Sequence, residues 1–293
     1  HFKIYLIMKS KILFLLFSVI VAAGIVFTIS SCNKDEALPP IDGYNSADEV
    51  ASTNLVAYWP MDGNGTEKKS GSAAASSSNA TFVTGAKGQA VKFDKGYLSY
   101  NEISALNSLP NMTVSVWANF DNNGTSPSVF FSMTRANEWA GNINLMSETG
   151  WRKSGSDTLL LKGLVVTNKD NNPSWQDSRN EPKNGGVQSP KGINKWNHII
   201  MTWDGATSNF KIYHNGVKVS NPEWETRGTT GPLNFYTPTK ALIGAWQTNL
   251  PNGGTAEAWQ VPMTGMVDEV RVYNKALTDA EIGALYKLEL AGR

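Results

Sequence analysis

The stretch GMVDEVRVYNKALTDAEIGALY (Gly265–Tyr286) begins as a β-strand and contains one residue that does not fit. Side chains alternate between the two faces of a strand, so one face takes Met266, Asp268, Val270 and Val272, and the other takes Val267, Glu269, Arg271 and Tyr273. We predict that the first set is buried, although it includes a carboxylate. Because an ionised aspartate is rarely buried without a partner, the partner of Asp268 is the first question for the structure.

The second half of the same stretch predicts a C-terminal helix. Thr278 can cap it, and Glu281, three residues later, completes a capping box. Ile282, Leu285 and Tyr286 then form one apolar stripe. We expect this short helix to lie against a β-sheet.

The chain before this stretch is a series of short apolar segments separated by Gly, Asn, Pro and Ser clusters, which is typical of β-strands. The predicted strands are Leu55–Trp59, Ala90–Phe93, Thr113–Phe120, Ser128–Met133, Leu159–Val166, Trp196–Trp203, Phe210–His214, Val217–Val219, Ala241–Gly244 and Met266–Tyr273. Asn215-Gly216 between two of them predicts a type I′ hairpin. The low-complexity segment Ser70–Ala80 is predicted to be a mobile loop. These strands, spread over about 235 residues, favour an all-β, two-sheet antiparallel sandwich with a sizeable core.

Several motifs of this β-rich region occur in a recognisable order. They are LVAYWPMDGNG (Leu55–Gly65), GQAVKFD (Gly88–Asp94), MTVSVWANF (Met112–Phe120), WNHIIMTWDG with FKIYHNGVKV (Trp196–Val219), ALIGAW (Ala241–Trp246) and the stretch quoted above. Together they resemble the laminin G-like domains of the concanavalin A-like lectin/glucanase superfamily, from about residue 54 to residue 286. The resemblance implies a jelly-roll domain, which we place at residues 54–290. It does not imply one function, since that superfamily contains lectins, carbohydrate-binding modules, glycosidases and protein-binding domains.

The N-terminus has the pattern of a secretory signal peptide. Two lysines precede the apolar run Ile12–Ile29, and Met8 is the expected true start. The run ends in Ile-Ser-Ser-Cys, which resembles the lipobox of bacterial lipoproteins. We therefore expect cleavage after residue 31 and lipidation of Cys32, the only cysteine of the chain. The alternatives are an uncleaved membrane anchor and an ordinary thiol.

Residues 32–53 are predicted to form a lipidated, flexible tether, because they are polar, include a Pro pair and lack periodicity. Asp35-Glu36 resembles the export signal of surface-displayed lipoproteins in Bacteroides-like bacteria. The expected location is therefore the outer membrane, at the cell surface. Cleavage would remove three of the 26 basic residues and no acids, leaving 23 against 25 acidic residues. This balance argues against nucleic acid as a partner.

The partner of Asp268 could be a calcium ion. The first and last strands lie side by side in domains of this type, and the first strand leads into Asp62-Gly63-Asn64-Gly65. Oxygen-bearing side chains on a glycine-rich bend suit a hard cation. The resemblance implies a structural calcium held by Asp62, Asn64 and Asp268. The alternatives are backbone N–H groups that cap Asp268, or a salt bridge with Lys68 or Lys69.

Catalytic motifs do not stand out in the sequence. The Glu-x-Asp-x-x-Glu pattern of laminarinase-type enzymes is absent, and sialidase-type Asp boxes are absent as well. After cleavage the chain keeps two histidines, His198 and His214, neither of them in a nucleophile or zinc motif. A carboxylate pair brought together by folding stays possible, so enzyme activity is left open.

Tryptophan is the most informative residue type, with ten in the chain. Trp59, Trp117, Trp196 and Trp203 lie in the strand motifs and are expected to be core residues. Trp139, Trp151, Trp175, Trp224, Trp246 and Trp259 are expected in or beside loops, each near polar side chains. A flat apolar ring beside hydrogen-bonding groups suits a sugar, while large loops also pack on their own aromatics. The predicted ligand-binding residues are Trp139, Trp175, Trp224, Trp246 and Trp259, with Trp175 and Trp224 as the first choices.

The sequence therefore predicts a surface-anchored lipoprotein that binds a polysaccharide or a host glycan for neighbouring glycan-processing proteins. One alternative is a glycoside hydrolase or lyase with an unrecognised carboxylate pair. Another is a protein-binding adhesion or scaffold module that uses the Trp-rich loops as its interface.

Overall fold

The structure is a computed structural model that describes residues 38–181 and 191–293. The chain divides into a unit of residues 1–39 and a compact unit of residues 40–293, and the second is described here. The signal peptide, Cys32 and Asp35-Glu36 lie outside the described residues. No helix in the described ranges is both long and apolar enough to cross a membrane.

The compact unit is an antiparallel β-structure with one helix at its C-terminal end. Its strands are β1 Leu55–Trp59, β2 Ser76–Thr84, β3 Gln89–Asn101, β4 Met112–Asn119, β5 Ser128–Arg135, β6 Ile143–Ser147, β7 Leu161–Lys169, β8 Asn172–Arg179, β9 Asn197–Asp204, β10 Asn209–His214, β11 Val217–Lys218, β12 Pro238–Ile243 and β13 Met263–Tyr273. The helices are α2 Pro222–Glu225 and α3 Asp279–Leu290, with 3-10 turns η1 Ala47–Glu49, η2 Ser52–Asn54, η3 Ser104–Leu106, η4 Thr149–Trp151 and η6 Gln247–Asn249.

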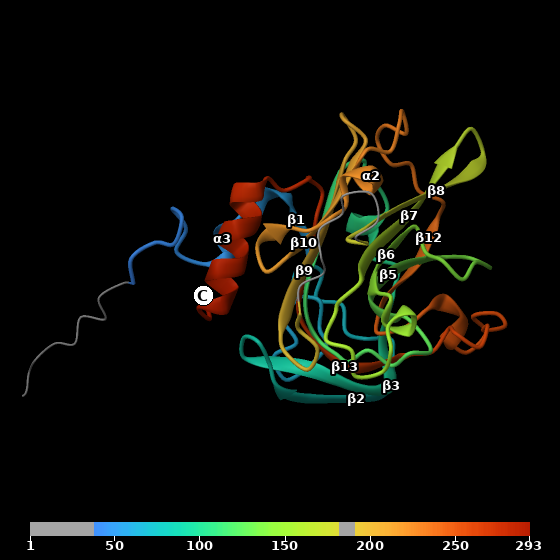
Figure 1. Cartoon of the computed structure of the whole chain (residues 1–293), viewed down its shortest axis with the longest axis horizontal. Helices are drawn as coiled ribbons and strands as arrows, with labels where there is room; N and C mark the ends of the chain where they lie inside the picture. The colour runs from blue at the N-terminus through green and yellow to red at the C-terminus, as the bar shows by residue number, and fades with distance from the viewer. Residues whose placement is uncertain (1–37, 182–190) are drawn as a thin grey trace, which may run out of the picture. The chain divides into compact units, whose positions relative to one another are not determined.

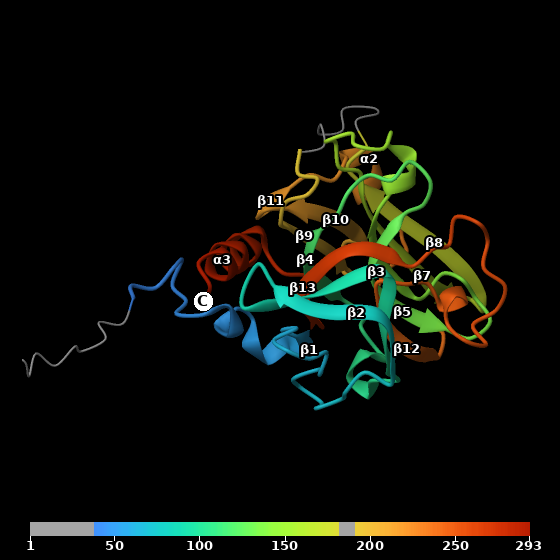
Figure 2. The same cartoon turned by 90° about the horizontal axis from the view of Figure 1, so that it is seen from below.

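The strands form two layers of one curled sandwich, in the order β11-β10-β9-β4-β13-β3-β12-β5-β6-β7-β8, with β1 added to β13 and β2 to β3 (Figures 1 and 2). The long strand β3 joins the layers, because Val91 to Gly96 pair with β13 while Leu98 to Asn101 pair with β12. A Cβ atom added to Gly163 on β7 would lie 2.7 Å from the Phe210 ring on β10. The two layers therefore pack closely, and the predicted jelly-roll-like sandwich is confirmed.

The core between the layers is large and aromatic. Trp59, Trp203, Phe131 and Phe210 are fully buried in it. Trp117 is buried as predicted, whereas Trp196 is only half-buried. Each such ring removes a large apolar area from water, which is the main favourable term in folding.

Three strands were not predicted from the sequence: β2, β6 and β8. The segment Ser70–Ala80, predicted as a loop, contributes Ser76–Ala80 to the start of β2. The hairpin at Asn215-Gly216 is confirmed, since both residues have positive φ and join β10 to β11.

The C-terminal helix α3 is capped as the sequence predicts. The Glu281 N–H donates to the Thr278 hydroxyl at 3.2 Å, and the Thr278 N–H donates to the Glu281 carboxylate at 2.8 Å. Ile282 and Leu285 are buried, and the Tyr286 ring stacks 5.8 Å from Trp117. The helix lies on the layer of β4, β9 and β10, away from β7 and β8 (Figure 1).

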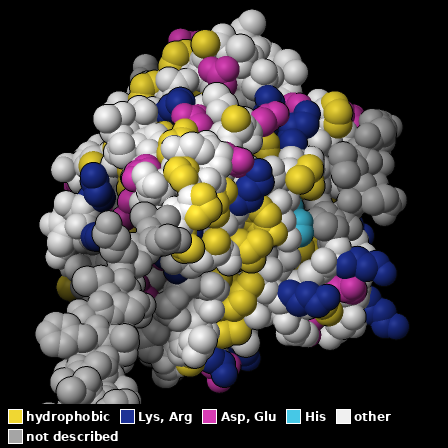
Figure 3. Space-filling model, turned by 90° about the vertical axis from the view of Figure 1, so that its left-hand side faces the viewer, with side chains coloured by type: hydrophobic (Ala, Val, Ile, Leu, Met, Phe, Trp, Pro, Cys, Tyr) yellow, Lys and Arg dark blue, Asp and Glu magenta, His cyan; other side chains and the backbone are white. Residues whose placement is uncertain are grey.

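Part of the predicted tether packs on the domain instead. Val50 is fully buried in the cluster beneath α3, and the Ala47 N–H donates to the Arg293 carbonyl at 3.3 Å. The compact unit therefore begins at Pro40, before the predicted boundary at residue 54. Figure 3 shows the side of the domain that bears α3, where a band of hydrophobic side chains is flanked by charged ones.

The strand that opened the sequence analysis does not alternate as predicted. A β-bulge between Asp268 and Arg271 places Glu269 at φ 46°, so Val267, Val270 and Val272 all face the core. Glu269 and Arg271 are nevertheless fully buried, because the N-terminal segment and α3 cover their side of the sheet, and Asp268 is fully buried against the turn between β2 and β3. The predicted phase of the strand is therefore wrong before the bulge, where Val267 rather than Met266 faces the core, and right after it, where Val270 and Val272 do.

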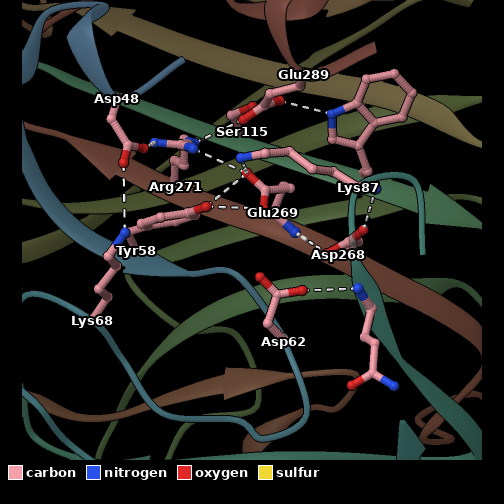
Figure 4. A network of polar contacts seen from close by, with 12 residues as sticks. Asp48, Tyr58, Asp62, Lys68, Lys87, Ser115, Asp268, Glu269, Arg271 and Glu289 are labelled. Atoms are coloured by element: carbon pink, nitrogen blue, oxygen red, sulfur yellow. Dashed lines mark hydrogen bonds and ion pairs between the residues drawn. The ribbon is translucent and has the colours of Figure 1, made fainter. Parts of the chain in front are cut away.

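Arg271 is the centre of a buried ionic network under α3 (Figure 4). Its guanidinium donates to Glu289 at 2.7 Å, to Asp48 at 2.8 Å and to Glu269 at 2.9 Å. It also lies 3.8 Å from the centre of the Tyr58 ring. Since these contacts join the N-terminal segment, β13 and α3, we call this set the Arg271 network.

Candidate tryptophan pocket

The candidate site lies on the outer face of the layer formed by β5 to β8. Along β7, Leu161 and Val165 point into the core, whereas Lys162 and Leu164 point outward. The register of β8 places Arg179 opposite Lys162 and Asp177 opposite Leu164. One face of this layer therefore carries charged groups beside an apolar floor.

Four tryptophans gather on this face around Trp139. The Trp139 ring lies 5.1 Å from Trp259, 5.3 Å from Trp246 and 5.6 Å from Trp175, measured between ring centroids. Tilted and edge-on rings at these separations attract one another. Met146, Leu164 and Val166 lie beneath the cluster and support it. The sequence predicted all four rings as ligand-binding residues, and the structure brings them together.

A pocket of about 330 Å³ lies beside this cluster, and we call it the tryptophan pocket. Its aromatic walls are Trp139, Trp246 and Trp259, together with Trp151 from η4. Met146 and Leu164 form an apolar floor. Trp151 is 55% exposed, so a large part of its side chain is accessible to a ligand. Concave sites with apolar walls and a few fixed polar groups are the usual form of small-molecule binding sites.

Two charged side chains line the tryptophan pocket within the described chain: Lys162 and Glu148. Their charged atoms are 2.9 Å apart, and Asp177 lies 4.0 Å from the same ammonium group. The Lys162 ammonium is also 5.4 Å from the centre of the Trp151 ring, within the range of a cation–π contact. The pair thus holds donors and an acceptor at the edge of the apolar floor.

Two further hollows adjoin the tryptophan pocket. One, of about 390 Å³, shares Thr125 and Pro127 with it. The other, of about 370 Å³, shares Trp139 and has mainly polar walls that include Gln247 and Gln260. A ligand longer than the central pocket therefore has room on either side.

The predicted ligand residues do not all have the expected environment. Trp175 lies in strand β8 rather than in a loop, and it is 42% exposed. Trp246 is only 1% exposed, so it supports the pocket wall more than it offers a stacking face. Trp224 lies on α2, outside the tryptophan pocket, with the Arg179 guanidinium 4.0 Å from its ring centre.

The partner of Asp268 is a turn between β2 and β3. Its carboxylate accepts hydrogen bonds from the Lys87 N–H at 3.0 Å and the Glu269 N–H at 2.8 Å. Gly85 and Gly88 of this turn approach Asp268 and Asp62 so closely that an added Cβ would clash with each carboxylate. Burial raises the pKa of the Asp268 carboxyl to about 8.

The predicted calcium ligands do not form a metal cage in the described residues. Asp62 accepts from the Gln89 N–H at 2.8 Å, and the Asn64 side chain accepts from the Thr66 N–H at 2.8 Å. No group of three His, Cys, Asp or Glu side chains able to hold a metal occurs in the described ranges. This donor set fits the backbone-capping alternative better than calcium, although the capping turn is Gly85–Gly88 and not the glycine-rich bend at 62–65. Calcium stays a prediction.

His198 and His214 are both buried and hydrogen-bonded to neighbouring side chains. His198 is fully buried, 2.7 Å from the Ser115 hydroxyl, and burial lowers its pKa to about 3. His214 lies 2.8 Å from the Asn197 side chain, and burial lowers its pKa to about 4. Neither residue lines the tryptophan pocket.

Sequence reasoning did not select three residues that the pocket brings together: Trp151, Glu148 and Lys162. Trp151 was recognised as a loop tryptophan but not included among the predicted ligand residues. Glu148 and Lys162 are far apart in the sequence, and the pairing of β6 with β7 brings them near each other. The sequence signal for them was weak: one acid before a tryptophan and one lysine in an apolar strand.

The fold and this pocket define an all-β sandwich domain with an aromatic-walled pocket. The chain belongs to the Concanavalin A-like lectin/glucanases superfamily, whose Laminin_G_3 family matches residues 94–283. No curated protein matches the sequence significantly.

Solved structures with the same fold share little sequence with this chain. Domain 4 of AbnA, a GH43 extracellular arabinanase from Geobacillus stearothermophilus solved with arabinotriose, is 18% identical with a TM-score of 0.53. The match covers 79% of this chain and 98% of that domain. The binding domain of botulinum neurotoxin DC, solved with SialylT, is 12% identical with a TM-score of 0.55, over 82% of this chain and 52% of the toxin domain. The binding domain of Paraclostridial Mosquitocidal Protein 1 is 14% identical with a TM-score of 0.53, over 80% and 52% of the two chains.

Proposed function

We propose that this domain binds carbohydrate in the tryptophan pocket. The observation that carries the proposal is the arrangement of exposed indole rings around an apolar floor, with the Lys162–Glu148 pair at its edge. A sugar offers an apolar C–H face to such rings and a rim of hydroxyl groups to such a pair. Structures of the same fold in complex with arabinotriose and with SialylT support the proposal at the level of the fold.

We also propose that the domain is displayed on the cell surface by a lipid on Cys32. Support comes from the sequence alone: an apolar run that ends in the only cysteine, followed by acidic residues. Cys32→Ala should abolish lipidation and release the processed protein from the membrane fraction. If the variant keeps its membrane fractionation and its mass, the apolar run is itself the anchor.

The glycan proposal is tested with the full chain, purified in mild detergent, on a glycan array and by affinity electrophoresis with polysaccharides. Trp151→Ala and Trp259→Ala should lose retention, because each removes an accessible ring from the pocket wall. Trp224→Ala is the matched control, since it removes a half-buried ring outside the pocket. If the wild-type chain binds no glycan across a broad array, the proposal fails. Normal binding by both pocket variants would place the site elsewhere.

A further inference from the structure

The charges around the tryptophan pocket are balanced in pairs. Lys162 and Glu148 form the closest pair at 2.9 Å, and their side chains are only 15% and 7% exposed. Asp177 lies 4.0 Å from Lys162, 3.9 Å from Arg179 and 3.9 Å from Arg227, and Glu181 lies 3.0 Å from Arg179, so three cations face three carboxylates. The described part of the pocket wall therefore offers no cation that lacks an acidic neighbour.

This pairing disfavours an anionic ligand. A carboxylate or sulfate that approached Lys162 would meet the charge of Glu148 at close range, and like charges repel. Displacing Glu148 from the ammonium would leave a largely buried carboxylate without its partner, which is strongly unfavourable. Asp177, next to the same ammonium, adds to this repulsion.

The same pair suits hydroxyl groups. The Lys162 ammonium has three donors, and its 4.0 Å separation from Asp177 is too long for a direct hydrogen bond. Glu148 uses its Oε1 atom toward Lys162, and its Oε2 atom can accept from a second group. A hydroxyl can accept from Lys162 while the neighbouring hydroxyl donates to Glu148, and the ion pair stays intact.

We propose that the tryptophan pocket selects a neutral glycan, with the Lys162–Glu148 pair recognising two adjacent hydroxyl groups. The inference rests on the proposed function, since it names the ligand class of the same site. The indole rings of Trp151 and Trp259 contact the apolar face of the sugar above the floor of Met146 and Leu164, and the pair provides the directional contacts at its edge. Charge balance gives the specificity, because an anionic chain gains no net attraction and loses part of its hydration.

The first test compares neutral and anionic polysaccharides with the full chain. Arabinan, galactomannan and a β-glucan serve as neutral probes, and polygalacturonate and hyaluronan serve as anionic probes. We expect binding to at least one neutral probe with an affinity that changes little when sodium chloride is raised. Preferential, salt-sensitive binding of the anionic probes would overturn the inference and leave the proposed function standing. If the chain binds none of these probes and no glycan on the array, both the inference and the proposed function fail.

The second test changes the charge of the pair without changing its size. Glu148→Gln should keep neutral binding within about threefold, because glutamine still accepts a hydrogen bond, and should add salt-sensitive binding to polygalacturonate. Lys162→Met should weaken neutral binding about tenfold, the equivalent of one charged hydrogen bond. Lys218→Met is the matched control, because the Lys218–Glu225 pair has the same 2.9 Å separation outside the pocket. Thermal melting of each variant shows whether it is folded.

The pattern of the variants decides the role of the pair. Weaker neutral binding in Lys162→Met with normal binding in Lys218→Met supports the proposal. If folded Glu148→Gln and Lys162→Met both bind every probe as the wild type does, the pair does not contact the ligand and the inference is wrong. Gain of anionic binding in Glu148→Gln alone supports charge balance as the cause of selectivity.

Discussion

The tryptophan pocket and the Arg271 network use the same residue types in opposite ways. Each contains a tryptophan, a cation and carboxylates within a few ångströms. In the network, Trp117 donates its indole N–H to Glu289 at 2.7 Å, and Arg271 is fully buried. In the pocket, Trp151 is 55% exposed and lies beside Lys162.

The difference lies in what covers each region. The N-terminal segment and α3 close over the centre of the network, so Glu269, Arg271 and Glu289 have lost their water and depend on one another, while Asp48 at the edge stays half-exposed. Nothing in the described chain closes the pocket in this way, so its rings can still exchange water for a ligand. Residue type alone therefore does not separate a buried structural tryptophan from one that lines an open pocket.

The largest expected effect comes from breaking the network. Arg271→Met leaves Glu269 and Glu289 buried without their shared cation, which typically costs about 3–5 kcal/mol of unfolding free energy. Urea unfolding monitored by tryptophan fluorescence gives this value. The control is Lys287→Met, which breaks an exposed pair with Asp42 at 2.7 Å and should cost about 0–1 kcal/mol. Equal losses in the two variants would show that the network is not dependent on burial.

The tryptophans provide the second test of the comparison. Trp117→Ala removes a buried ring and its hydrogen bond and should cost about 3–5 kcal/mol. Trp151→Ala removes an exposed ring and should change stability by about 0.5 kcal/mol or less. Denaturant midpoints of the two variants measure the difference. A strongly destabilised Trp151→Ala would mean that this ring stabilises the pocket itself and is not simply available to a ligand.

The fold could be predicted from the sequence because its motifs record local alternation and turn chemistry. The bulge at Glu269 was missed because Met266 continues the alternation of Val270 and Val272, although the three-residue step from Val267 to Val270 is its mark in the sequence. Strand β8 was missed because NPSWQDSR contains Asn and Pro, which usually indicate a turn. The structure accommodates Pro173 because β8 is at the edge of the sheet, where a missing N–H breaks no ladder.

The candidate site could be predicted only in part, because it depends on which distant segments the fold brings together. Four loop tryptophans could be proposed from their polar neighbours, and they do converge. The position of Trp224 could not be foreseen, because α2 folds over Arg179 rather than over the pocket. The Lys162–Glu148 pair depends on the register of β6 against β7, and register comes from the whole sheet.

A pH titration should reveal the cost of burying Asp268. Burial raises its folded pKa from 3.8 to about 8, so the folded state holds a proton that the unfolded chain has released. Stability should therefore fall as pH rises between these values. Below pH 6.5, His198 opposes this fall in stability. Burial lowers its pKa, so the unfolded state binds a proton that the folded state does not. Between about pH 6.5 and 8, we expect a loss of about 1–2 kcal/mol.

The control for this titration is Asp268→Asn, which cannot ionise. Its stability should change less over the same pH range, and Glu269, whose pKa burial also raises, should account for the remaining slope. Denaturant unfolding at a series of pH values gives both curves. A wild-type curve that is flat or rises from pH 6.5 to 8 would show that the backbone N–H groups keep Asp268 ionised.

The smallest expected effect is that of a chelator. The carboxylates of Asp268 and Asp62 accept backbone N–H groups in the described structure, so EDTA should leave the melting temperature unchanged. A ligand that binds only the folded state would raise that temperature, and its removal would lower it. If EDTA destabilises the wild type, added calcium restores it, and Asp268→Asn abolishes the response, the calcium prediction is right and the capping account is wrong. The same outcome would make Asp268 a calcium ligand. The calcium site would then lie directly beside Glu269 of the Arg271 network.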